Sequence, residues 1–174
     1  MPDDNADDSV PYQRLWILCL GPHAGEDLSV QIKQAKELLA KHSANGYSGT
    51  LFVRWVDLER LGGLLYRAGL YEQAAQHLEE SLAAYPDDAL RDFRTALDKK
   101  LLLAMAKWQL GQRDEARRLL AETLPALDKW LQKPINTWMR RAEIELLRRE
   151  AVALIEPAEA DEAVERKGRT SDEQ

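Results

Sequence analysis

Two stretches in the middle of the chain match each other when their glycines are aligned, and this internal repeat constrains the fold most. Gly111 follows Gly69 by 42 residues, and the run Ala-Gly-Leu-Tyr-Glu-Gln-Ala around Gly69 matches Leu-Gly-Gln-Arg-Asp-Glu-Ala around Gly111. A repeated unit of about this length is typical of helical hairpins that stack to share one core. Further residues fall in register as pairs: Leu61 with Leu103, Tyr66 with Trp108, Ala74 with Ala116, and Leu78 with Leu120.

Composition and hydrophobic spacing predict an all-α fold. Apolar residues make up 45% of the 174, and few of the 9 glycines and 7 prolines fall inside the periodic segments. The apolar run 15–20 is short enough for a strand, but the strong helical pattern after it favours a helix. Pro125 lies inside the sixth predicted helix and should kink it or end it early. After the helix at 15–20, we predict helices over about 27–42, 50–68, 71–85, 89–110 (or from 92), 114–131 and 137–155.

The middle repeat resembles the tetratricopeptide repeat, which is a pair of antiparallel helices. This resemblance implies a solenoid within 10–132, with repeats at 50–86 and 92–131 and a degenerate one at 12–46. It also implies a capping helix at 134–156, and we expect disordered charged tails at 1–9 and 157–174. The residues that carry the resemblance are Leu58, Leu61-Gly62, Leu65-Tyr66, Gly69, Tyr71, Ala74, Leu78 and Pro86.

The phrase Leu-Tyr-Arg-Ala-Gly-Leu-Tyr-Glu-Gln-Ala, at 65–74, is also similar to arrays at the C-terminal end of large bacterial multidomain proteins. Some of those carry a serine/threonine kinase domain upstream. The chain itself has no glycine-rich loop and no His-Arg-Asp sequence, so no kinase motif is present. The resemblance therefore implies two alternatives, a separate scaffold or a regulatory or sensor segment detached from such a protein.

In tetratricopeptide proteins the first helix of each pair lines a concave groove, which usually binds a protein or peptide. The aligned Tyr66 and Trp108 are amphipathic aromatics that suit an interface, although packing between repeats would explain them equally well. A clamp for a terminal carboxylate would need basic residues where Glu59 and Leu101 stand, so that ligand is not expected. By alignment, the predicted groove residues are Glu59, Tyr66, Arg67, Asp98, Leu101, Met105, Trp108 and Gln109.

No combination of residues in the sequence indicates catalysis, a cofactor or a metal. The three histidines, at 23, 42 and 77, are far apart in sequence and lack convergent thiols or carboxylates. Cys19, the only cysteine, lies in the apolar run and is expected to be a buried core residue. We therefore predict a protein that is not an enzyme and that works by binding.

Charge and hydropathy indicate which kinds of partner and which cellular compartment to expect. The net charge of −6 argues against nonspecific nucleic-acid binding. The three Arg-Arg pairs have two interpretations, a basic face that binds an acidic partner or a solvated face whose arginines pair with nearby Glu. No stretch approaches the roughly 18 apolar residues of a membrane span, and a lone cysteine suits a reducing cytoplasm. Three repeats are near the minimum for a stable stack, so self-association through exposed ends is an open expectation.

Overall fold

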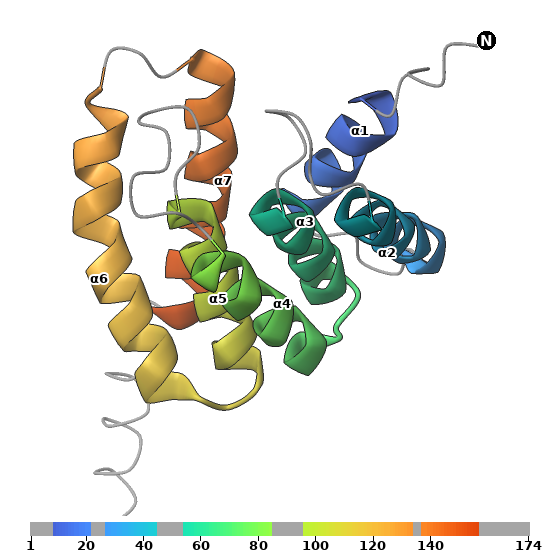
Figure 1. The fold of residues 1–174 in the computed structure, drawn as a ribbon. Helices are drawn as coiled ribbons and strands as arrows, with labels where there is room; N and C mark the ends of the chain where they lie inside the picture. Colours follow the sequence, from blue (N-terminus) through green and yellow to red (C-terminus); the bar gives the residue numbers. More distant parts are fainter. Residues whose placement is uncertain (1–8, 22–26, 45–53, 85–95, 134–136, 157–174) are drawn as a thin grey trace, which may run out of the picture.

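The computed structural model describes residues 9–21, 27–44, 54–84, 96–133 and 137–156. Within these ranges it holds seven α-helices and no strand, which confirms the all-α prediction (Figure 1). No helix in these ranges is long and apolar enough to cross a membrane. The helices are α1 (Ser9–Cys19), α2 (Ser29–Ala44), α3 (Arg54–Arg67), α4 (Tyr71–Ala83), α5 (Leu97–Gln109), α6 (Arg113–Leu131) and α7 (Trp138–Ile155).

Local signals place several helix ends correctly. The Asp27 carboxylate accepts a hydrogen bond from the Ser29 N–H (2.9 Å) where α2 begins, and Thr137 caps α7 by accepting from the Arg140 N–H (3.3 Å). Helix α1 begins at Ser9, earlier than the helix predicted at 15–20. Residues 1–8 and 157–174 lie outside the described ranges.

Helix α6 continues through Pro125 as far as Leu131, so the prediction of an early end is wrong. An internal proline costs a helix about 3 kcal/mol because it removes one backbone donor and crowds the preceding turn. Beyond it, Leu127 and Trp130 are both buried in the core. Burial of two such large side chains contributes a similar or larger amount, about 1.5–3 kcal/mol each, so packing keeps the last turns helical.

The hairpins α3–α4 and α5–α6 turn through the same backbone geometry. Gly69 and Gly111 take φ values of 76° and 78°, in the left-handed region. In each turn the glycine N–H donates to the carbonyl three residues before it, and the next N–H donates to the carbonyl five residues before it, all at 2.9–3.0 Å. This arrangement satisfies the free carbonyls at the helix end and favours glycine, which confirms both predicted breaks.

Helices α3 and α4 approach very closely at Gly62. A Cβ atom added there would lie 2.7 Å from Leu78 Cγ and 3.3 Å from the Ala74 carbonyl oxygen, so no larger residue fits without movement. Leu78 and Ala74 are themselves fully buried. This contact is the reason for the small residues that the repeat pattern places here.

Helices α1 and α2 both pack on α3, while α1 and α2 make few or no contacts with each other. Gly63 of α3 lies against α1, because an added Cβ would be 2.7 Å from Cys19 Sγ. On the α2 side, the buried His42 Nδ1 lies 2.8 Å from Asp57 Oδ2 of α3. Helix α3 is therefore covered by α1, α2 and α4, and nearly all of its residues are buried.

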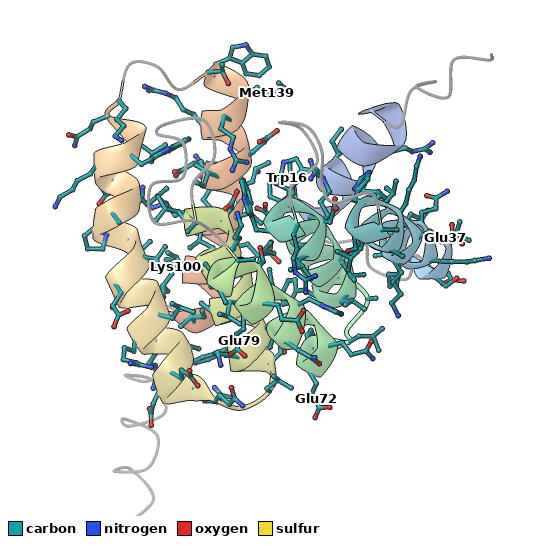
Figure 2. The ribbon with its side chains drawn as sticks, viewed as in Figure 1. Trp16, Glu37, Glu72, Glu79, Lys100 and Met139 are labelled. Atoms are coloured by element: carbon teal, nitrogen blue, oxygen red, sulfur yellow. The ribbon has the colours of Figure 1, made fainter. Side chains whose placement is uncertain are left out.

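Helix α7 packs mainly on α5 and less on α6 (Figure 1). Two of its side chains also contact helices other than α5 and α6. Glu150 of α7 forms an ion pair with Arg67 of α3, and Arg140 of α7 lies over the ring of Trp16 in α1. In Figure 2, Trp16 lies between α1 and α7. The segment predicted to cap the stack therefore also crosses the side of α3 and α5 that carries Arg67 and Asp98, which we call the inner face.

Candidate partner-binding surface

The predicted groove residues lie on α3 and α5, and most of their side chains are buried. Trp108 is half-buried and Gln109 is exposed. The Arg67 side chain is only 3% exposed because it pairs with α7. The remaining five of the eight are buried: Glu59, Tyr66, Asp98, Leu101 and Met105.

The first polar contact on the inner face is a group of charged side chains, Glu59, Asp98, Lys99 and Arg140, which we call the charged cluster. Lys99 Nζ lies 3.1 Å from Glu59 Oε2 and 3.5 Å from Asp98 Oδ1, so one cation joins α3 to α5. Asp98 Oδ2 accepts a hydrogen bond from Arg140 Nη2 of α7. Arg140 also pairs with Glu143, one turn along α7, at 3.0 Å. The cluster thus holds three helices together.

Two tryptophans flank the charged cluster. Lys99 Nζ lies 4.6 Å from the centre of the Trp55 ring, and the Arg140 guanidinium lies 5.5 Å from that of Trp16. Stacking on an aromatic face stabilises a cation that has lost most of its water. Sequence reasoning missed Lys99, Arg140 and both tryptophans, because no local pattern separates a buried charge from a surface one.

Burial sets the ionisation of the two carboxyl groups in the charged cluster. Desolvation, followed by repulsion from Asp98, raises the pKa of Glu59 to about 7, and Lys99 only partly opposes this. Burial would also raise the pKa of Asp98, but Lys99 and Arg140 outweigh it and hold that pKa well below its usual value. Glu59 Oε1 has no hydrogen-bond partner. In the charged cluster, Asp98 therefore stays ionised at neutral pH, whereas Glu59 gains or loses its proton near neutral pH.

The second polar contact joins Arg67 of α3 to Glu150 of α7 through two parallel hydrogen bonds. Arg67 Nη2 lies 2.6 Å from Glu150 Oε2, and Arg67 Nη1 donates to Oε1. The remaining donor, Nε, bonds to the Cys19 carbonyl of α1 at 2.9 Å, and the guanidinium lies 5.1 Å from the Tyr66 ring centre. Paired, forked contacts of this kind are the strong ones. Burial, and then the nearby Glu150, raise the pKa of the Tyr66 phenol.

Aliphatic packing fills the space between these two polar contacts. On α5, Leu101 and Met105 follow Asp98 at helical spacing, so all three share one face, and both are fully buried. Four residues of α7 are buried in the same hydrophobic core at spacings of three and four: Ile144, Leu147, Ala151 and Ile155. An amphipathic helix seated on an apolar surface between polar contacts is a recurring mode of protein recognition.

The aligned aromatics Tyr66 and Trp108 differ in their surroundings. Tyr66 stacks on Tyr71 across the first turn, with ring centres 5.8 Å apart. Trp108 instead lies between two arginines of α6, with Arg113 at 4.4 Å and Arg117 at 5.3 Å from its ring centre. Arg113 occupies the position that Tyr71 has in the first hairpin, so a cation stands in place of the aromatic ring that packs on Tyr66. Trp108 is half-buried at the edge of the inner face.

The other arginines of α7 are largely paired with carboxylates. Arg148 lies 3.0 Å from Asp128 of α6, and Glu145 lies within 3.6 Å of both Arg148 and Arg149. For the Arg-Arg pairs the sequence allowed either a basic binding face or a solvated face whose arginines pair with carboxylates. The ion pairs of Arg148 and Arg149 correspond to the second alternative.

Two reactive side chains considered in the sequence, Cys19 and His42, both lie in the core. The Cys19 thiol is buried, and burial raises its pKa to about 12, so it is not a nucleophile near neutral pH. His42 is held by Asp57 inside the core. Among the described residues, no three His, Cys, Asp or Glu side chains are grouped so that they could hold a metal ion.

Comparison of the chain with protein-family models, curated proteins and solved structures gave no match. The function therefore has to be inferred from the residues and the geometry of the inner face.

Proposed function

We propose that this chain is a non-catalytic scaffold of tetratricopeptide-like hairpins that binds a protein or peptide on the inner face of α3 and α5. The two hairpins with equal turns support a repeat architecture. The observation that carries the proposal is that α7 packs on α5 and pairs with Asp98 of α5 and Arg67 of α3 on this face. The unpaired Cys19 agrees with a reducing compartment, so we place the protein in the cytoplasm.

The partner would first meet the half-exposed edge of the inner face, at Trp108 and Gln109. Gln109 is exposed at the end of α5, next to the half-buried Trp108. An aromatic ring held by two cations and bordered by a polar amide is a common type of interface hot spot. This edge is the place on the face that is open while α7 is in position.

The test is photo-crosslinking in the native host with a benzophenone amino acid at Gln109. The matched control places the same group at Gln73, an exposed glutamine of α4. We expect one protein to crosslink from position 109 and not from 73, and a Trp108→Ala change to reduce that product severalfold. Equal products from both positions, or none from 109, would refute the proposed binding face.

The alternative function is a regulatory or sensor segment of a larger signalling protein such as a serine/threonine kinase. The position of α7 on the inner face supports this alternative, because a binding site that is covered by a helix of the same chain needs a signal to expose it. The genomic neighbourhood tests it: a catalytic domain encoded directly upstream would support this alternative, and unrelated neighbours would count against it.

A further inference from the structure

Helix α7 contacts more of the molecule than a helix that merely continued the stack. Packed helix axes lie roughly 8–10 Å apart, so each added layer touches the layer before it and not the earlier ones. Helix α7 touches α5, yet it also pairs with Arg67 of α3 and stacks on Trp16 of α1. Besides its packing on α5 and α6, α7 therefore contacts the inner face through two long side chains, Arg140 and Glu150.

We call the part of the inner face between Asp98 and Arg67, which α7 contacts, the seat. Its two ends require side chains of opposite charge. Asp98, with Glu59 behind it, accepts the cation Arg140, whereas Arg67 accepts the carboxylate Glu150. Arg140 and Glu150 are ten residues apart, which corresponds to about 15 Å along a helix. A helix bound in the reverse direction would place like charges together, so the seat selects one direction.

The seat is also costly to leave empty. The side chains of Asp98 and Lys99 are 1% and 0% exposed, and Arg140 is one of the cations that keep Asp98 ionised. Removing one member of a buried ion pair is strongly destabilising unless something replaces it. Whatever displaces α7 must therefore supply a cation at Asp98 and a carboxylate at Arg67, with aliphatic residues between them.

We propose that the inner face is a binding site for an amphipathic partner helix that carries a cation about ten residues before a carboxylate, and that α7 is the competing helix of the chain itself. This inference rests on the proposed function and adds the class of partner. The pattern read from α7 is a cation at 140, aliphatic or small residues at 144, 147, 151 and 155, and a carboxylate at 150.

The test uses a fluorescent peptide with the sequence of residues 137–156, titrated into full-length protein and followed by anisotropy. In the wild type, tethered α7 competes at a high effective concentration and should keep the peptide weakly bound. Glu150→Arg sets two arginines against each other and should loosen α7, so we expect the peptide to bind at least tenfold tighter. The control, Glu156→Arg, makes the same charge change at an exposed position of the same helix end and should behave as wild type.

A charge swap identifies the site. The peptide with Glu150→Arg should bind poorly to the Glu150→Arg protein, yet it should bind a protein with Arg67→Glu, which repels the normal peptide. If arginine at 150 prevents folding, as judged by circular dichroism, Glu150→Gln loosens the same contact and should tighten peptide binding severalfold. Equal binding of both peptides, or no binding to a folded, loosened variant, would overturn the inference.

The outcome is separable from that of the crosslinking experiment. A partner that crosslinks at Gln109 while the α7 peptide fails to bind would support the scaffold and refute this class of partner. Peptide binding that obeys the charge swap, without any crosslinked protein, would support the seat and refute the proposed function.

Discussion

Replacing Glu59 by glutamine should remove a pH-dependent part of the folding free energy. The folded protein raises the pKa of Glu59 from the ordinary value of 4.5 to about 7. Between these values the folded state still binds a proton that the unfolded chain has released, so stability falls as pH rises through this range. Below about pH 4.5 both states are protonated, and above about pH 8 both are ionised, so the contribution is constant outside the window.

The size of the effect follows from the width of this window. A shift of one pKa unit corresponds to about 1.4 kcal/mol, so the change from 4.5 to about 7 corresponds to about 3 kcal/mol. The groups that face Glu59 are Asp98 and Lys99 of α5 and Arg140 of α7. The pKa of Asp98 is lowered, so its own contribution is lost only as pH falls below about 4, outside this window.

Urea unfolding of the wild type and the Glu59→Gln variant between pH 4.5 and 8 measures the difference directly. We expect the free energy of unfolding of the variant, minus that of the wild type, to increase by about 3 kcal/mol across this range. Glu72→Gln, at an exposed position of α4 (Figure 2), is the control and should give a curve parallel to the wild type. A difference that stays constant with pH for Glu59→Gln would refute the reasoning.

Three further predictions concern the turns and the core. Gly62→Ala should lower stability by about 1 kcal/mol in urea unfolding, because crowding against Leu78 outweighs the gain in helix propensity, and a stabilised variant would contradict the close contact. Gly69→Ala should cost about 1–2 kcal/mol through its positive φ alone, since no atom lies within 4 Å of the added Cβ, and an unchanged melting curve would exclude the left-handed turn. The Cys19 thiol should react with a disulfide reagent only at the rate of unfolding, and rapid labelling in native buffer would show that it is accessible.

The features that the sequence predicted are those determined over a few neighbouring residues. The helix breaks at Gly69 and Gly111 depend on local backbone geometry, and both are confirmed. The close contact at Gly62 followed from the repeat pattern, which fixes the pairing of adjacent helices. Hairpin partners could thus be assigned without knowledge of the rest of the fold.

The position of α7 could not be obtained in this way. The helix has apolar residues on more than one side, and the structure leaves Trp138 and Leu146 exposed while it buries Ile144 and Leu147. Hydrophobic spacing alone does not choose between such faces, because the choice depends on what lies opposite. The same holds for Lys99, which looks like a surface residue in the sequence and is fully buried against carboxylates from two helices.

The contact between Trp16 and Arg140 brings the first and last helices of the described chain together. In an open array, each unit touches only its neighbours, so the ends can unravel while the middle persists. Here α7 cannot lift away without also breaking its contact with α1, so opening of α7 should raise amide hydrogen exchange in both terminal helices together.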